Sequence, residues 1–308
     1  MPLGRSILLA AARSRRLNDF ALRSAFVKRA TRTFMPGEHA DEALAAGAVI
    51  AASGRGLIFT QLGEAITSAD AAVAVRDHYL GFFDQVRARG LPAQVSVKPT
   101  QLGLDLSFAE CERHLRALAA RAEETGSALW LDMEDSSYVS RTLELYAALK
   151  RSHPSTGVAL QAYLRRTPED LSRLMPLDPV IRLVKGAYDE PKEVAFEKKS
   201  DTDRAYYALA SQMLEGARTG VCSPVFGTHD LALITRIAER AASLRVAKDK
   251  YQVHMLYGIR DSAQRRLVAE GHIVKTLISY GAAWYRWYMR RLAERPANVL
   301  FVVKALFA

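Results

Sequence analysis

The chain has 308 residues, 49% of them hydrophobic, and a formal net charge of +10. This length and composition predict a globular protein with a large buried core. No apolar run reaches the roughly 18 residues of a membrane-spanning helix, and Ile7–Ala12 is too short for a secretory signal. The two distant cysteines, Cys111 and Cys222, show no metal-binding spacing and predict buried thiols in a reducing cytoplasm.

Residues 1–36 form a basic amphipathic segment that we expect to be helical. It contains eight Lys and Arg residues but a single acid, Asp19, and its basic residues are interleaved with apolar ones. Such a segment fits an anionic membrane surface or another protein face, and it also fits simple packing against the core. Nucleic acid is disfavoured because no recognised binding motif accompanies the charge. We therefore separate this segment from a second domain over residues 37–308.

Beyond residue 37, short apolar runs alternate with long amphipathic stretches. The predicted strands are Leu57–Gln61, Gln94–Lys98, Ala128–Met133, Val158–Tyr163, Val180–Val184, Pro224–Thr228, Tyr251–Leu256 and Ile273–Ser279. The clearest predicted helices are Ile66–Arg89, Phe108–Glu124, Thr202–Arg218 and Leu231–Leu244. Eight strands with helical spacers predict an α/β fold of the (βα)8 barrel type. A doubly wound sheet is the alternative, but no GxGxxG motif follows any strand.

The predicted strands end in polar residues, where a barrel carries its chemistry. These residues are Lys98, Asp132, Gln161, Arg182, Lys185, His229 and His254. Each alone has an ordinary structural explanation, such as capping the next helix. Together they predict a functional site, and the excess of basic residues predicts an anionic ligand. The seven histidines show no ligand spacing, so no metal is expected.

Two kinds of chemistry remain open at this end of the predicted barrel, which we call its mouth. Lys98 or Lys185 could form a Schiff base if its neighbours lowered the lysine pKa. The other possibility is a phosphate-bearing cofactor with a small carboxylate substrate. Gly186 would then allow close backbone approach, and Gln161 and Thr228-His229 could hydrogen-bond the cofactor.

Near the C-terminus, an aromatic and basic stretch over residues 284–295 predicts a helix that ends before Pro296. The adjacent Arg290 and Arg291 point about 100° apart on a helix. They could still grip one carboxylate from two directions, because each guanidinium offers a planar fork of donors. Glu294 follows Arg290 by four residues and can hold it in place.

Several runs together resemble the monofunctional bacterial proline dehydrogenases. They are SVKPTQLGLDL, LDMEDSSY, LQAYLRRT, IRLVKGAY, GTHD, HMLYGI and YMRRLAERPANVLF, and the match extends from about Thr33 to the end. The resemblance implies a distorted (βα)8 barrel that binds FAD. It implies oxidation of L-proline to 1-pyrroline-5-carboxylate, with electrons passing to a membrane quinone. It is consistent with a cytoplasmic protein in peripheral contact with the inner face of the membrane.

The resemblance also implies roles for individual residues. Asp132 and Arg182 would form the active-site pair, with Arg182 near the flavin N5 edge. Lys98, Arg290 and Arg291 would bind the substrate carboxylate, with Glu294 orienting the arginines. Tyr188 and Leu256 would border the substrate pocket. FAD would be held by Met133, Gln161, Lys185, Gly186, Ala187, Thr228 and His229.

The chain departs from the family pattern at several positions. Leu277 and Trp287 stand where pocket tyrosines are expected, His254 replaces a glutamine, and Pro99 replaces a leucine. The carboxylate-binding set is intact, so the changes predict a reshaped ring pocket or tolerated drift. Hydroxyproline, pipecolate or a biosynthetic intermediate therefore stay open as alternative substrates to proline. A Schiff-base lyase and a barrel without catalytic activity are further alternatives.

Overall fold

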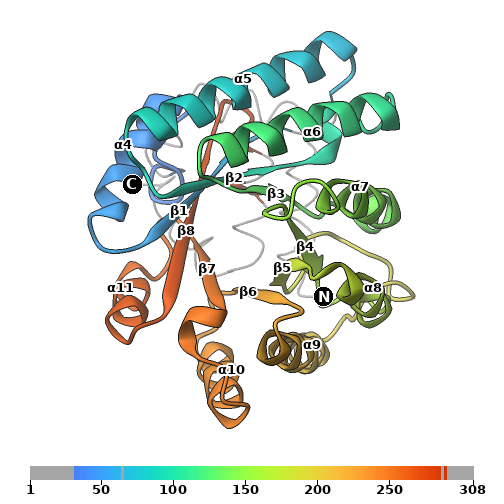
Figure 1. Ribbon diagram of the computed structural model, residues 1–308, viewed down its shortest axis with the longest axis vertical. Helices are drawn as coiled ribbons and strands as arrows, with labels where there is room; N and C mark the ends of the chain where they lie inside the picture. The colour runs from blue at the N-terminus through green and yellow to red at the C-terminus, as the bar shows by residue number, and fades with distance from the viewer. Residues whose placement is uncertain (1–30, 64–65, 286–287, 290–308) are drawn as a thin grey trace, which may run out of the picture.

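The structure is a computed structural model that describes residues 31–63, 66–285 and 288–289. Eight parallel strands close into a barrel in chain order, with helices around the outside (Figure 1). The strands are β1 (Gly56–Gln61), β2 (Ala93–Val97), β3 (Leu129–Leu131), β4 (Gly157–Gln161), β5 (Val180–Val184), β6 (Ser223–Gly227), β7 (Gln252–Leu256) and β8 (Ile273–Tyr280). The barrel is closed by β8 against β1, in register from Gly56↔Lys275 to Gln61↔Tyr280. The predicted (βα)8 fold is confirmed.

The helices pack on the outer face of the strands. They are α4 (Ala40–Ala51), α5 (Ala69–Ala88), α6 (Phe108–Glu124), α7 (Val139–Lys150), α8 (Thr167–Leu174), α9 (Lys199–Thr219), α10 (Leu231–Ser243) and α11 (Asp261–Ala269). The predicted bounds of α6 match the structure. Helix α5 begins three residues later than predicted, because Ser68 caps it by accepting a hydrogen bond from Ala71 N. Figure 1 shows α5 and α6 side by side on one side of the barrel.

Both faces of the strands are buried, as is usual for parallel sheets. On the outer face of β1, Leu57 and Phe59 join the main core, and the Phe59 ring lies 5.2 Å from that of Phe82 on α5. On the inner face, Ile58 packs with Trp130, Val225 and Leu277. Because side chains alternate along a strand, this contact identifies the inward-facing positions of the barrel.

The predicted N-terminal segment lies mostly outside the described residues, which begin at Thr31. The end of this segment packs against the barrel: Met35 is buried, and the Thr33 carbonyl approaches Gly258 closely. A Cβ at position 258 would lie 1.6 Å from Thr33 O, and its φ of +71° also favours glycine. Over the ranges described, no helix combines the length and apolar character needed to cross a membrane.

Both cysteines are buried, as predicted. Burial raises the pKa of each thiol to about 12. Neither sulfur is therefore a thiolate at neutral pH, and we assign both a packing role.

Candidate active site

The centre of the site is a buried ion pair between Arg182 on β5 and Asp132, the residue that follows β3. Arg182 Nη2 donates to Asp132 Oδ1 and, at 2.9 Å, to Ser96 Oγ on β2. Ser96 Oγ in turn donates to Asp132 Oδ1 at 2.9 Å. Arg182 is only 3% exposed, and burial lowers the pKa of its guanidinium while Asp132 raises it. The three side chains join strands β2, β3 and β5 at one point inside the barrel.

One buried nitrogen of this arginine remains available. Arg182 Nη1 has no hydrogen-bond partner among the described residues. A buried donor without a partner is costly, so such an atom in a mouth indicates a ligand acceptor. The structure brings the predicted pair together, and Arg182 Nη1 keeps a donor for an acceptor outside the described residues.

Trp130 and His254 lie next to Arg182 within the barrel. The Arg182 guanidinium carbon is 4.9 Å from the centre of the Trp130 ring, and the His254 ring meets that indole edge-on at 5.4 Å. His254 is fully buried, and its Nε2 lies 3.1 Å from Gln252 Oε1. Burial, followed by the charges of Arg182 and Lys275, lowers the pKa of His254 well below its usual value. His254 is therefore neutral at pH 7 and adds no charge beside Arg182.

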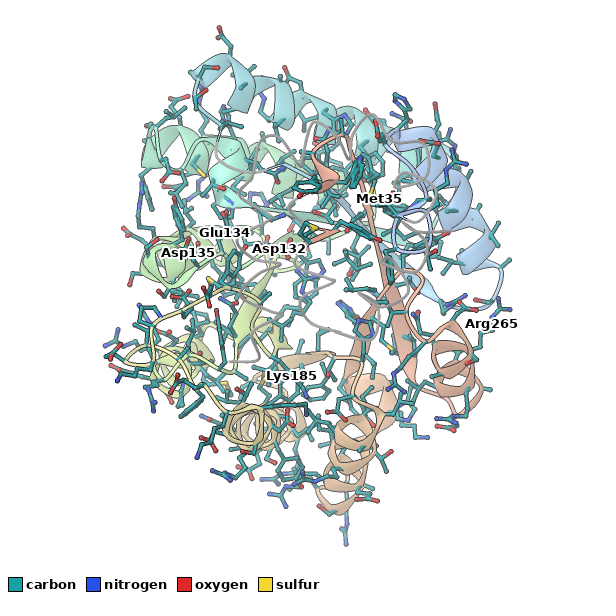
Figure 2. All side chains as sticks on the ribbon, turned by 180° about the vertical axis from the view of Figure 1, so that it is seen from behind. Met35, Asp132, Glu134, Asp135, Lys185 and Arg265 are labelled. Atoms are coloured by element: carbon teal, nitrogen blue, oxygen red, sulfur yellow. The ribbon has the colours of Figure 1, made fainter. Side chains whose placement is uncertain are left out.

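Lys98 projects from the end of β2, at the start of the 3₁₀ turn Pro99–Leu102. The turn is fixed to the end of β3, because Glu134 accepts from Thr100 N at 3.0 Å and from Thr100 Oγ1 at 2.6 Å. Lys98 is 8% exposed, and its ammonium has no hydrogen-bond or ionic partner in the part of the chain that the structure describes. Figure 2 shows Asp132 nearer the barrel axis than Glu134 and Asp135.

Lys98 and Asp132 lie at the ends of adjacent strands. Val97 pairs with Leu131 in the sheet, and Asp132 N donates to Val97 O at 2.8 Å. A second buried cation thus stands near the Arg182 pair without a counterion of its own among the described residues. This arrangement suits an anionic ligand.

The residues predicted to hold a cofactor lie at the ends of β4, β5 and β6. Gln161 is buried and donates to Glu134 O at 2.8 Å, which links β4 to β3. Thr228 Oγ1 accepts from Asp230 N at 3.2 Å. Leu256 N donates to His229 Nε2 at 3.4 Å, so the end of β6 contacts the end of β7. Because Nε2 accepts this bond, the geometry assigns the ring proton of His229 to Nδ1.

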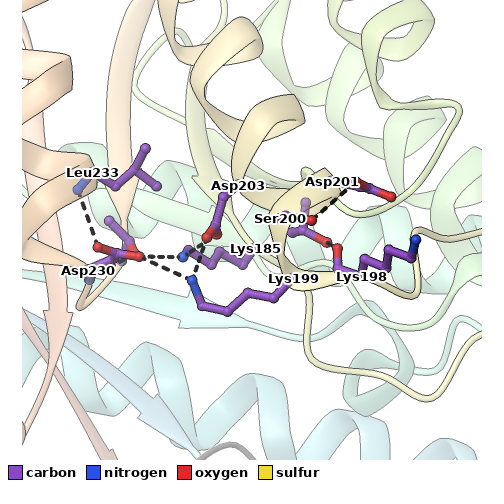
Figure 3. Close-up of polar contacts among 10 residues, drawn as sticks. Lys185, Lys198, Lys199, Ser200, Asp201, Asp203, Asp230 and Leu233 are labelled. Atoms are coloured by element: carbon purple, nitrogen blue, oxygen red, sulfur yellow. Dashed lines mark hydrogen bonds and ion pairs between the residues drawn. The ribbon is translucent and has the colours of Figure 1, made fainter. Parts of the chain in front are cut away.

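Lys185 is not a free cation at this mouth. Its ammonium donates to Asp203 Oδ1 at 2.6 Å and to Asp230 Oδ2 at 2.8 Å, and Lys199 adds a second ammonium to the same carboxylates (Figure 3). Burial, the largest single cause, raises the pKa of both aspartates. The hydrogen bonds and charges of Lys185 and Lys199, with the Leu233 N–H at Asp230, together outweigh it and leave both pKa values lowered. Asp230 also caps α10 through Leu233 N. The network joins the end of β5 to the starts of α9 and α10.

Gly186 allows the chain to turn sharply after Lys185. Its φ is +119°, and a Cβ there would lie 2.1 Å from the Tyr163 ring. The loop that follows carries Ala187 and the half-buried Tyr188. Farther on, Glu190 fixes the loop to the end of β3 by accepting from Ser136 N at 2.7 Å and Ser136 Oγ at 2.5 Å. Backbone and side-chain bonds thus hold this loop between β3 and β5.

The remaining predicted residues fall into two groups. Leu256 ends β7, and its register partner Leu277 on β8 faces into the barrel beside Ile58 and Trp130. Met133, which follows Asp132, is buried. The other residues lie outside the described ranges, and their roles stay predictions: Trp287, Arg290, Arg291 and Glu294.

Three site residues were missed by reasoning from the sequence. Ser96 lies two residues before Lys98 on the same face of β2, a spacing that could have revealed it. Glu134 stood in the LDMED run but lacked an assigned partner. Asp203 lies 18 residues after Lys185, and only the packing of α9 brings it close. Within the residues described, no cluster of three or more His, Cys, Asp or Glu side chains is arranged to hold a metal ion.

Comparison with known proteins identifies the family. Residues 43–304 match the family model described as proline dehydrogenase. Proline dehydrogenase 1 of Bacillus subtilis subsp. natto is 34% identical over 98% of both chains. A proline dehydrogenase of Deinococcus radiodurans is 34% identical over 89% of this chain and 88% of its own. The chain belongs to the proline dehydrogenase family. It is thus an oxidoreductase of the class that acts on CH–NH groups.

The fold of the family is also found among solved structures. Proline utilization A from Bdellovibrio bacteriovorus, in a structure inactivated by N-propargylglycine, superposes with a TM-score of 0.81 at 22% identity. The match covers 93% of this chain but only 38% of that protein. At this identity the likeness concerns the barrel alone. The barrel of this proline dehydrogenase family member thus has a known counterpart within a longer chain.

Proposed function

We propose that this protein oxidises L-proline to 1-pyrroline-5-carboxylate with FAD and passes the electrons to a quinone. The observation that carries the proposal is the pair of buried cationic groups, Lys98 and Arg182 Nη1, for which the described residues supply no further partner. Lys98 follows the carboxyl end of β2, and the Arg182 side chain bonds Asp132 just after β3, at the end of the barrel where substrates bind. Family membership makes proline the first candidate for the carboxylate-bearing ligand.

The polar residues of the mouth fit a flavin. Arg182 offers buried donors to an acceptor, and Gly186 leaves a backbone without a side chain at the end of β5. Gln161 at the end of β4 and Thr228 and His229 after β6 present polar atoms on either side of it. FAD, when bound, would accept the two electrons that proline loses as a ring C–H bond breaks and the adjacent carbon–nitrogen single bond becomes a double bond. Lys185 would hold it with Met133, Gly186 and Ala187, in a position that Asp203 and Asp230 maintain.

The chain's own residues would bind and orient the substrate. Lys98 would contact the proline carboxylate together with the predicted pair Arg290 and Arg291, and Glu294 would orient that pair. Asp132 and Ser96 hold Arg182 by one nitrogen, so the guanidinium cannot turn freely. Such preorganised charge acts without reorganisation during the reaction. Tyr188 and Leu256 would border the ring of the substrate.

A second substrate class is supported by Leu277. Its side chain faces the inside of the barrel, where the family pattern has a tyrosine, and it packs against Ile58 and Trp130. Compared with tyrosine, leucine at this position would leave the substrate ring without a neighbouring hydroxyl. Oxidation of a substituted or enlarged cyclic amino acid by the same chemistry is therefore the alternative. One lost pocket contact changes substrate preference by about 10- to 200-fold.

The proposed contact with a membrane quinone rests on the N-terminal segment. Residues 1–36 combine basic and apolar side chains, a composition suited to an anionic lipid surface. Binding to vesicles that contain anionic lipid should fall with salt, because exposed charges are screened over about 8 Å at physiological ionic strength. Equal binding by the full chain and by a truncated variant that remains folded would contradict this part of the proposal.

The proposed binding of the substrate carboxylate by Lys98, Arg290 and Arg291 can be tested by Arg291→Met. Loss of one charged partner of a buried carboxylate should cost about 2–5 kcal/mol, or roughly 30- to 4000-fold in substrate binding. FAD should stay bound, which absorbance of the purified variant would verify. The matched control is Arg173→Met on the exposed face of α8, where no change in catalytic efficiency is expected. Unchanged efficiency of Arg291→Met with any carboxylate substrate would refute the assigned role.

A further inference from the structure

Lys275 lies inside the barrel at the end opposite the candidate active site. It is the third residue of β8, and the residue two positions on, Leu277, packs inside the barrel with Ile58 and Trp130. Val274, one position before it, packs outward with Ile234 and Leu267. Side chains alternate along a strand, so Lys275 faces inward. The active site lies at the carboxyl ends of the strands, and Lys275 therefore belongs to the barrel floor.

The barrel makes room for this side chain but supplies no counterion. Gly56, its partner on β1, lies beneath the aliphatic stem: a Cβ there would come within 2.8 Å of Lys275 Cγ and 3.3 Å of Cε. The ammonium has no hydrogen-bond or ionic partner among the described residues, and the side chain is only partly exposed. Desolvation without a counterion disfavours the charged form of an amine.

The ionisable groups around Lys275 do not compensate its charge. On β7 its register partner is His254, which is buried and neutral at pH 7. On the outer side of the barrel, Asp261 of α11 pairs with Arg55 and Arg265. Burial accordingly lowers the pKa of Lys275 from 10.5 to about 8. A substantial fraction of this lysine is a neutral amine near pH 7.5, and a neutral amine is nucleophilic.

We propose that Lys275 is a modification site on the barrel floor, where its amine takes an acyl group from a small acyl phosphate. In its charged form Lys275 attracts the anionic donor, because no described carboxylate competes for it, and the same group reacts after it has released its proton to solvent. The partial burial selects small donors over bulky ones. Neither argument depends on the proposed oxidation of proline.

In the proposed step, the neutral amine of Lys275 attacks the acyl carbon. A nitrogen–carbon bond forms, the bond from that carbon to the phosphate oxygen breaks, and phosphate leaves with the electron pair. The nitrogen releases one proton to solvent, and nothing is oxidised or reduced. The product is an amide, which has lost the positive charge of the lysine. His254 would then lose one of the two cations that, after burial, lower its pKa.

The test is acylation of the full, folded protein by acetyl phosphate, followed by digestion and mass spectrometry. The internal control is Lys250, an exposed lysine just before β7. At pH 7.5 the neutral fraction of an amine with a pKa of about 8 is roughly 240-fold that of one at 10.5. Lower basicity and restricted access offset part of this ratio, so we expect Lys275 to react at least about tenfold faster than Lys250.

Two further measurements make the result decisive. The rate at Lys275 should rise to a plateau with a midpoint near pH 8, and the preference over Lys250 should vanish in urea. Lys275→Arg, which keeps the charge, should remove the assigned modification. A folded-state rate at Lys275 equal to or below that at Lys250 would overturn the proposal, as would a preference that persists in the unfolded chain.

Discussion

Asp132→Asn should destabilise the fold by removing the negative partner of a buried arginine. Asp132 is the acidic partner of Arg182 among the described residues, and Arg182 is almost wholly buried. Removing one member of a buried ion pair typically costs about 3–5 kcal/mol, and a hydrogen bond to a charged group is worth about 1.5–3. Asp132 is 22% exposed on its side chain, and asparagine keeps an oxygen in place. We therefore expect a loss of about 2–4 kcal/mol.

The assay is urea unfolding at pH 7, followed by circular dichroism, with the slope against urea compared between variants. The matched control is Glu169→Gln, which makes the same chemical change in an exposed pair with Arg173. Exposed pairs contribute about 0–1 kcal/mol. If Asp132→Asn lowered the free energy of unfolding no more than this control does, the uncompensated charge of Arg182 would not be a source of instability.

A double variant separates the charge from the shape of the side chain. In an Arg182→Met background there is no buried cation to leave unpaired. The cost of Asp132→Asn should then shrink, because the two effects are not additive for residues in contact. An equal cost in both backgrounds would assign the loss to Ser96 or to packing instead.

Three other predictions concern further residues of the candidate site. The folded-state pKa of His254 is lowered, so below about pH 6.5 the unfolded chain binds a proton that the folded chain does not. The free energy of unfolding therefore falls as the pH is lowered, by up to about 1.4 kcal/mol per pH unit. The stability of wild type relative to His254→Gln should therefore decrease from pH 7 to pH 5.5 in urea unfolding, and a constant difference would contradict the buried neutral histidine. Gly186→Ala places a Cβ against Tyr163 at a φ of +119°, so it should weaken flavin retention on gel filtration. Full flavin retention together with an unchanged free energy of unfolding would argue against a role for the Gly186 backbone in holding the flavin. Leu277→Tyr combined with Trp287→Tyr should shift the ratio of catalytic efficiencies toward proline and away from ring analogues by roughly 10- to 200-fold. A wild type that already prefers proline would mark both substitutions as drift.

The barrel could be predicted because its strands carry local signals. Short apolar runs such as Val180–Val184 and an amphipathic stretch such as Phe108–Glu124 correspond to the observed elements. Helix ends were less predictable: the start of α5 depends on the hydroxyl of Ser68, a single hydrogen bond that periodicity does not report. The strand β3 is only three residues long, so Asp132 lies beyond its end rather than within it.

The site was predictable where a charged residue interrupts or directly follows an apolar strand, as Arg182 and Lys98 do. It was not predictable where distant residues meet. Lys185 was expected to contact the cofactor, but its position between Asp203 and Asp230 depends on how α9 and α10 pack. Likewise, Glu134 fixes the turn after Lys98 through bonds between separate strands. Lys275 looked ordinary in the sequence, and only the closure of β8 on β1 places it inside the barrel.

The most direct test of the proposed function is anaerobic mixing of the purified protein with L-proline while its visible absorbance is recorded. The account predicts flavin bands in the protein as isolated or after addition of FAD. It also predicts bleaching of those bands by proline or a close ring analogue, with a product two hydrogens lighter than the substrate. A folded protein that binds no flavin, or a bound flavin that no cyclic amino acid reduces, would contradict it.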